Sequence, residues 1–133
     1  MDTKLAEEMA ANARDAVDLS KTRFQVDLDY TVDSLQLLEQ LFDRVQYSMP
    51  DPESTETTGL LTRLWGGYFG EVMRRHLGGE WLLWKDEHGR AIALQVGRAT
   101  IFPLNKVKKR LERGAGHNIW EFYQELSAAL SKS

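Results

Sequence analysis

The polar residues whose types and spacing could carry chemistry gather in one stretch, residues 59–84, with the sequence GLLTRLWGGYFGEVMRRHLGGEWLLW. Glu71 and Arg75 are spaced i, i+4 in the order that favours an ion pair on a helix. One interpretation is a structural ion pair, and the other is a polar site in a pocket beside Trp81 or Trp84. Such a site would use four polar side chains: Glu71, Arg74, Arg75 and His76.

The glycines of this stretch require a reason, because each costs a helix about 1 kcal/mol relative to alanine. On a helical projection three of them lie together opposite the apolar face: Gly59, Gly66 and Gly70. The residues beside them are Arg63, Gly67 and Arg74. Either another element of the same domain crosses closely there, or the surface is a shallow docking groove for a partner, bordered by the arginines that interfaces favour.

A second candidate surface is the basic face of the helix predicted after Pro103: Lys106, Lys109, Arg110 and Arg113. Residues 104–113 carry five basic groups against one acid, a local charge of +4 that leaves −7 for the rest of a chain whose total is −3. This face is either a solvated helix end with cations near its C-terminus or a surface for an anionic ligand or an acidic partner.

The common catalytic and metal-binding motifs are missing. His76, His88 and His117 are widely separated and no HExxH pair occurs, so no zinc site is predicted. The acidic run from Asp27 to Asp33 lacks the glycine and the final glutamate of an EF-hand loop. There is no GxxxxGK[ST] phosphate loop and no GxSxG turn. We therefore predict no catalytic residue, no metal and no cofactor.

The composition excludes several classes of protein. A chain of 133 residues with 42% hydrophobic and 28% charged residues is one globular domain long and is unlike a disordered chain. The absence of cysteine excludes disulfides and thiolate sites, and the net charge of −3 argues against nucleic acid as the main partner. No apolar run is long enough for a membrane span, and no secretory signal is recognisable, so a cytoplasmic location without a membrane partner is expected.

Residues 1–22 are predicted to form a helical arm with a hinge near residues 20–22. Its apolar stripe is narrow and consists of Leu5, Met9, Ala13 and Ala16 or Val17. A narrow stripe predicts weak docking, on the domain or on a second copy in a homodimer, and a small contribution to the stability of the fold. The alternation of Phe24, Val26 and Leu28 with polar residues then predicts a short edge strand.

Residues 23–133 are predicted to form a single α+β domain. Apolar residues recur every three to four positions in four predicted helices, at residues 29–46, 57–77, 103–113 and 118–130. The second is the core helix, with Thr57 or Thr58 as its cap and an apolar side formed by Leu61, Leu64, Trp65, Tyr68, Phe69, Val72 and His76. Residues 80–85 and 90–96 predict an antiparallel hairpin, followed by a third strand at 99–102. We expect helices packed on one face of a small antiparallel sheet of about three to four strands.

Three segments resemble a family of small bacterial domains of unknown function: LDYTVDSL at 28–35, YFGEVMRRHLGGEW at 68–81 and IFPLNKVKKRLERG at 101–114. The pattern that recurs in that family is a G-E-V-x-R-R-x-x-G-G-x-W core followed by a proline-initiated basic helix. The similarity covers residues 24–130 and omits the arm. The resemblance implies the fold and a bacterial cytosolic setting, and it implies no enzymatic activity or cofactor.

The sequence favours a non-catalytic protein-interaction domain, because charge is segregated and tryptophans are plentiful while no catalytic set occurs. A specific version is an immunity or inhibitor-type protein that binds a cognate toxin, since such proteins are often small, acidic and free of cysteine. The alternative is a small ligand-binding domain or enzyme that uses Glu71, Arg74, Arg75 and His76. A concave pocket with Glu71 and Arg75 pointing into it would favour the ligand, and a flat patch over a solid core would favour a protein partner.

Overall fold

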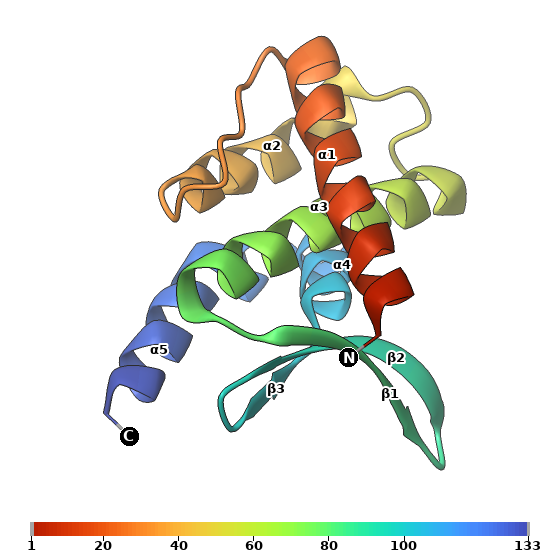
Figure 1. Ribbon diagram of the computed structural model, residues 1–133. Helices are drawn as coiled ribbons and strands as arrows, with labels where there is room; N and C mark the ends of the chain where they lie inside the picture. Colours follow the sequence, from red (N-terminus) through yellow and green to blue (C-terminus); the bar gives the residue numbers. More distant parts are fainter. Residues whose placement is uncertain (1, 133) are drawn as a thin grey trace.

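The computed structural model describes residues 2–132 and has the predicted α+β architecture (Figure 1). Three strands form one antiparallel sheet in the order β1-β2-β3, namely β1 Glu80–Asp86, β2 Gly89–Val96 and β3 Ala99–Ile101. The helices lie on one side of this sheet. Trp81 pairs with Leu94 and Leu94 with Ile101, and all three side chains are buried. This row forms the contact of the sheet with the helices.

Helix α3, Thr55–Leu77, lies at the centre of the fold. The side chains that its helical periodicity places on one side are buried, and they include Leu61, Trp65, Tyr68, Phe69 and Val72. The core-helix prediction is confirmed for these residues. It is wrong for His76, which is exposed because it lies in the last turn of α3, beyond the sheet contact.

The ends of α3 follow ordinary capping chemistry, although the predicted cap is displaced. Ser54, rather than Thr57 or Thr58, is the N-cap, and its Oγ accepts a hydrogen bond from the backbone N–H of Thr57 at 3.1 Å. The helix ends at Gly78, whose φ of 82° is accessible to glycine without strain. The chain then enters β1.

Helix α1 runs without interruption over Thr3–Phe24, so the predicted hinge at residues 20–22 and the predicted strand at 24–28 are wrong. Gln25 takes a left-handed conformation, with φ 58°, and the backbone N–H of Val26 donates to the carbonyl of Ser20. The N–H of Gln25 also donates to the carbonyl of Lys21, four residues earlier, which is the hydrogen bond of an αL helix end. The alternation of apolar residues therefore reflects the burial of Phe24 and Leu28 after a turn, without a neighbouring strand.

The apolar stripe of α1 packs into the core, contrary to the expected weak docking. Ala13 and Ala16 are fully buried, and their small side chains bring the helix backbone close to α3. A Cβ added at Gly67 of α3 would lie 2.9 Å from the Cβ of Asn12, closer than such atoms approach in proteins. The indole Nε1 of Trp65 donates to the Ser20 hydroxyl at 3.1 Å. The apolar stripe of α1 is narrow because α1 and α3 approach each other closely. A narrow stripe therefore did not predict weak docking of α1.

The remaining helices surround α3: α2 is Ser34–Ser48, α4 is Pro103–Arg113 and α5 is Ile119–Ser131, with a short 3-10 turn, η1, at Ala115–His117. The phenol of Tyr68 anchors the start of α2, since it lies 2.6 Å from the Ser34 hydroxyl and accepts from the backbone N–H of Tyr30 at 2.8 Å. Asn118 caps α5, as predicted, by accepting from the N–H of Glu121.

The packing of α1 changes the expected result of a truncation. The division into an arm at 1–22 and a domain at 23–133 stays a prediction, and deletion of residues 1–20 tests it. We expect a large fall in the melting temperature, because the deletion exposes the face of α3 around Gly67 and removes the hydrogen-bond partner of the buried Trp65 indole. Thermal unfolding followed by circular dichroism measures this change. A truncated chain that melts cooperatively within a few degrees of the full chain would support an independent arm.

Candidate functional site

Two glycines of the predicted docking surface are covered by the protein's own side chains. A Cβ added at Gly66 would lie 2.8 Å from the Cα of Leu104 in α4, and one added at Gly70 would overlap the indole ring of Trp81. Both glycines are buried. The close approach of α4 and of Trp81 therefore accounts for them, which is the intradomain interpretation of the glycine pattern.

The rest of that surface behaves differently. The Nη1 of Arg63 turns toward α1 and donates to the Oδ1 of Asn12 at 3.2 Å. Gly59 has no atom within 4 Å of the position where its Cβ would stand, apart from its own helix. Of the three predicted glycines, Gly59 alone faces open space.

Glu71 lies inside the protein, with 1% of its surface exposed. Its Oε2 accepts hydrogen bonds from the indole Nε1 of Trp81 and from the Nε of Arg74, both at 2.8 Å, and its Oε1 accepts from the Nη2 of Arg74 at 3.1 Å. Arg75 is a more distant partner, with 3.9 Å between its Nε and Oε1. The main ion pair of Glu71 is thus the bidentate pair with Arg74. The hydrogen bond from Trp81 to the same carboxylate holds β1 against α3.

The environment of Glu71 keeps its carboxylate charged. Burial alone would raise the pKa of Glu71, but the hydrogen bonds from Arg74 and Trp81 and the charges of Arg74 and Arg75 outweigh burial and lower the pKa below its ordinary value of 4.5. A carboxyl group in this state is a poor general acid near neutral pH, and it is well suited to hold a donor in place.

Arg75 and His76 belong to a different part of the surface. The guanidinium of Arg75 lies 3.7 Å from the ring centroid of Tyr30, within the range of a cation–π contact. The Nε2 of His76 is 2.7 Å from the backbone oxygen of the same tyrosine. These two residues hold the segment between α1 and α2 against the end of α3.

A hollow of about 310 Å³ lies between the first half of α1 and the start of β1. Glu71, Arg74 and Trp81 line it together with Ala6 and Glu7 of α1. Of the four polar residues predicted to form a ligand site, the structure therefore brings two to this hollow and places Arg75 and His76 outside its lining.

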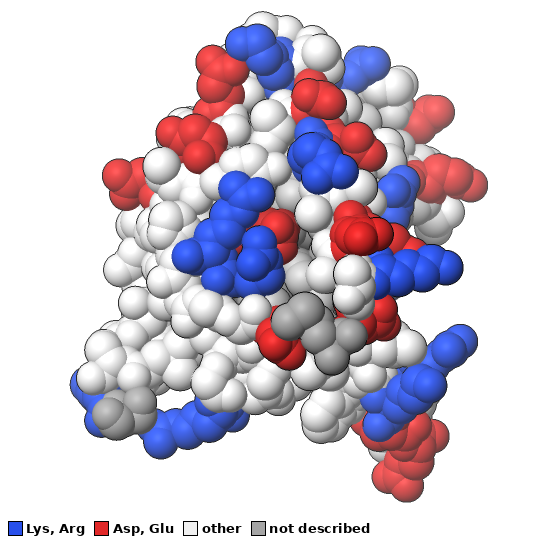
Figure 2. Space-filling view, in the orientation of Figure 1, with Lys and Arg blue, Asp and Glu red and all other residues white. Residues whose placement is uncertain are grey.

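The predicted basic face of α4 is divided between surface and interior. Lys109 and Arg113 are exposed, and the Nζ of the partly buried Lys106 lies 4.3 Å from the ring centroid of Phe122. Arg110 is only 4% exposed, so its prediction as part of an accessible binding face is wrong. On the side of the molecule that Figure 2 shows, cations and anions are intermingled, and no broad field of one sign is visible there.

Arg110 connects three helices. Its Nε donates to the Oε1 of Glu39 at 2.8 Å and its Nη2 to the Oδ1 of Asp43 at 2.9 Å, which joins α4 to α2. The other oxygen of Glu39 accepts from the backbone N–H of Ile119, the first residue of α5, at 2.7 Å. A carboxylate at a helix N-terminus is further stabilised by the helix dipole. This set of partners explains why a charge pair is tolerated inside a small domain.

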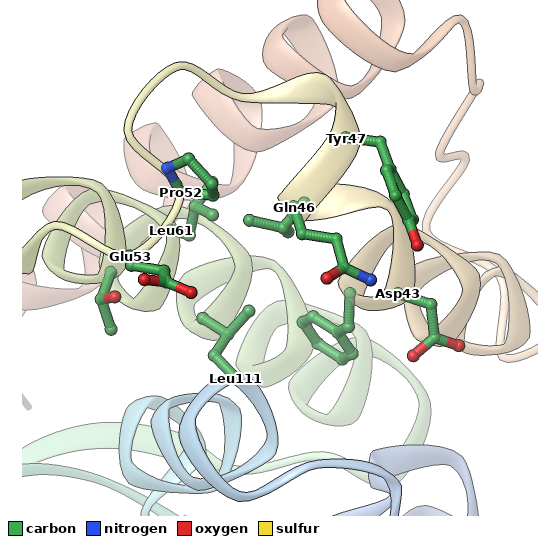
Figure 3. A pocket seen from close by; sticks show the side chains of 10 residues that line it. Asp43, Gln46, Tyr47, Pro52, Glu53, Leu61 and Leu111 are labelled. Atoms are coloured by element: carbon green, nitrogen blue, oxygen red, sulfur yellow. The ribbon is translucent and has the colours of Figure 1, made fainter.

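An open groove lies between α2, the start of α3 and α4, and we call it the α2–α4 groove (Figure 3). Its volume is about 560 Å³. Its floor is apolar and consists of Phe42, Val45, Leu61 and Leu111. The polar residues at its rim are Asp43, Tyr47 and Glu53, and Figure 3 shows them around the hollow. Tyr47 is 82% exposed, the highest exposure among the large hydrophobic side chains of residues 2–132.

The predicted residue Arg110 contributes to the groove from below. Its guanidinium lies 5.2 Å from the ring centroid of Phe42, under the apolar floor, and it holds the rim carboxylate of Asp43. The Asp43 side chain is nevertheless 71% exposed. Arg110 therefore positions two groove residues without itself being accessible.

The α2–α4 groove continues along the first turns of α3. A hollow of about 690 Å³ shares Glu53, Thr58 and Leu111 with it and adds Gly59, Thr62, Lys108 and Glu112. A further hollow of about 480 Å³ shares Gly59 and Thr62 and reaches α1 and Ile92 of β2. We call this continuation the α3 extension, with Gly59 and Thr62 at its centre.

Within residues 2–132, no group of three or more histidine, cysteine or acidic side chains is arranged to hold a metal ion. The same residues include no helix with the length and apolar character required to cross a bilayer.

Sequence reasoning missed the α2–α4 groove, because its walls come from segments far apart in the chain. The one available signal was the loop at residues 49–54, with its two prolines, between two predicted helices. Such a loop separates the helices that it joins, and here it leaves the groove open beside Glu53.

The interior position of Arg110 generates a prediction about stability. Arg110→Met keeps an unbranched apolar stem but leaves the Glu39 carboxylate buried without its cation. We expect the free energy of unfolding to fall by about 3–5 kcal/mol in urea denaturation. The matched control Lys109→Met, at the exposed neighbouring position, should change it by less than about 0.5 kcal/mol. Equal effects of the two substitutions would contradict the interior role of Arg110.

The lowered pKa of Glu71 generates a prediction about acid stability. The unfolded chain binds a proton at this residue near the ordinary pKa of 4.5, whereas the folded protein keeps the carboxylate charged to lower pH. The stability that this provides is present above the unfolded pKa and is lost as the pH falls through the folded pKa. Glu71→Gln removes this contribution, so its melting temperature should fall less than that of the wild type between about pH 5 and pH 3. Thermal melts measure this difference. If the melting temperatures of the wild type and of Glu71→Gln fall equally with pH, Glu71 makes no such contribution.

Comparison with known proteins identifies the family. A solved structure of a protein from Bacteroides thetaiotaomicron VPI-5482 is similar, with a TM-score of 0.71 at 17% sequence identity, and the match covers 95% of this chain and 45% of that one. At this identity the similarity shows the fold alone, and this chain spans less than half the length of that protein. No curated protein matches the chain. Residues 35–123 match the family described as "Domain of unknown function (DUF3806)", and the chain therefore belongs to this family.

Proposed function

We propose that this chain is a non-catalytic protein-interaction domain that binds its partner in the α2–α4 groove. The observation that carries the proposal is an open groove of about 560 Å³ with the exposed side chain of Tyr47 at its rim. A tyrosine that is 82% exposed adds little to the core of its own domain. Tyrosines are enriched at protein interfaces, where they often dominate the binding energy.

The polar residues first considered for a site support this choice, because several of them are engaged inside the domain. Glu71 binds Arg74 and Trp81, and Arg110 binds Glu39. These charged groups have partners already, which reduces what they could offer to a ligand. The groove is open by contrast, and the side chains that face solvent around it are those of Tyr47, Asp43 and Glu53, while Phe42, Val45 and Leu61 form a largely buried floor.

A more specific form of the proposal is an immunity or inhibitor-type protein, which would act by covering its cognate toxin. The small size, the net charge of −3 and the lack of cysteine fit this form and a cytoplasmic setting. A homodimer through α1 receives no support, since the apolar residues of α1 are buried within the chain's own core.

We also propose that the G-E-V-x-R-R-x-x-G-G-x-W segment is a core shared by the family. Gly70, Glu71 and Trp81 form one buried contact, in which the glycine makes room for the indole and the carboxylate accepts its N–H. A side chain at position 70 would overlap the indole of Trp81, and without Glu71 the buried indole N–H would lack its acceptor.

The alternative function is a small ligand-binding domain or enzyme, and the 310 Å³ hollow beside Glu71, Arg74 and Trp81 is the observation that favours it. The hollow would suit a small ligand with an apolar body and one group that pairs with Arg74. Crystal soaking or a thermal-shift screen with small carboxylates would test this function separately from the groove. A stabilising compound that protects Trp81 from quenching would favour it.

The groove proposal is tested by comparing two exposed aromatic residues. Proteins captured from a lysate by the wild-type domain are purified, and their affinities are measured for Tyr47→Ala and for the control Trp84→Ala, whose ring is 40% exposed on the hairpin. We expect Tyr47→Ala to weaken the interaction at least about tenfold and the control to leave it unchanged. Partners that bind both variants as tightly as the wild type would overturn the groove as the binding site.

A further inference from the structure

We infer that the occupant of the α2–α4 groove is an amphipathic helix with basic side chains, and that it passes over Gly59 into the α3 extension. The inference rests on the proposed function and names the chemistry of the partner. Three observations carry it: the unexplained glycine, an unsatisfied hydroxyl beside it and the charge of the rim.

Gly59 is the helical glycine that internal packing does not explain. Gly66, Gly67 and Gly70 each make room for Leu104, Asn12 or Trp81, whereas a Cβ at Gly59 would meet nothing within 4 Å. Glycine in the interior of a helix lowers its stability relative to alanine. A glycine without an internal neighbour is accounted for if something outside the domain approaches the backbone closely at this point.

Thr62 lies one turn along from Gly59 and lines the same two hollows. Its Oγ1 is buried and has no hydrogen-bond partner within the described part of the chain. Buried hydroxyls are nearly always paired, so an unpaired one calls for a partner. Because the hydroxyl is closed to solvent, a side chain in the α3 extension reaches it only if the wall of the hollow moves.

The form of the groove selects a helix as its occupant. Its apolar floor lies between three helices and consists of separate side chains, Phe42, Val45, Leu61 and the less buried Leu111, rather than a free row of backbone groups. A groove of this kind accepts apolar side chains at i, i+3, i+4 and i+7 of an amphipathic helix. An extended peptide would need the edge of a sheet, and β1 and β3, the edges of this sheet, do not line the groove.

The rim selects the charge of the occupant. Glu8, Asp43, Glu53 and Glu112 line the groove and its extension, against Arg63 and Lys108 as the cations. All four acids lie on the surface, and the Arg110 partner of Asp43 is buried beneath the floor. A helix with lysine or arginine beside its apolar stripe would complement this rim, and an acidic helix would be repelled.

The test uses two synthetic helical peptides of about 16 residues. Both carry leucine at i, i+3, i+4 and i+7, one with lysine at the remaining positions and the other with glutamate. We expect the lysine peptide to bind the full chain at least about tenfold more tightly, to shift the amide NMR signals of Gly59 and Thr62, and to weaken as salt rises from about 0.1 M to about 1 M.

Substitutions in the chain separate this mode of binding from a general attraction between charges. Gly59→Leu should weaken the lysine peptide about tenfold by filling the path. Gly59→Ala should raise the melting temperature by about 3–5 °C, which shows that the position tolerates a side chain in the free domain. The double variant Glu53→Lys and Glu112→Lys should abolish the preference for the lysine peptide. The control Glu125→Lys, an exposed acid on α5, should keep it.

The outcomes distinguish the two proposals. If the glutamate peptide binds equally well, or if binding leaves the signals of Gly59 and Thr62 unmoved, the inference about the occupant fails. The groove function then still stands or falls on the Tyr47→Ala comparison with the captured partner. If the captured partner is insensitive to Tyr47→Ala while the lysine peptide binds as expected, the groove recognises such helices in vitro and the proposed function fails.

Discussion

The fold depends on how closely other elements can approach the middle of α3. Gly66, Gly67 and Gly70 lie within two turns and leave the backbone of α3 without side chains on more than one side. Helix α4, helix α1 and the indole of Trp81 each pack against one of these glycines. Closer packing increases the number of van der Waals contacts that these elements make with α3. The loss in helix propensity at the three positions is therefore offset by tertiary contact, and α3 becomes the element on which the sheet and the helices are assembled.

Charged groups have a structural role in the same interior. Glu71 receives two donors from Arg74 and one from Trp81, and Glu39 receives donors from Arg110 and from the first N–H of α5. Glu39 joins α2 to α4 and α5, which come much later in the chain, and Glu71 joins α3 to β1, the element that follows it. Buried ion pairs of this kind contribute little net stability compared with apolar groups, but they are costly to break. In this domain they specify which helix end meets which strand or helix.

The sequence predicted what local periodicity determines and missed what tertiary contact determines. The core side of α3 and the hairpin were predictable because apolar spacing and turn residues act over a few positions. The packing of α1 was underestimated because Ala13 and Ala16 count little on a hydropathy scale, although small side chains permit the closest contact. Arg110 looked like its exposed neighbour Lys109, because nothing in the helix shows that Glu39 lies opposite. The α2–α4 groove could not be predicted, since Phe42 and Leu111 meet only in the folded chain.

The Glu39 contacts also bear on the order in which the domain can form while it is being synthesised. Glu39 precedes Arg110 by 71 residues and Ile119 by 80. Until both have left the ribosome, the carboxylate has neither of its partners, and its desolvation is opposed by the full hydration energy of the charge. Burial of Glu39 together with its partners therefore requires that α4 and the first residue of α5 have already been synthesised.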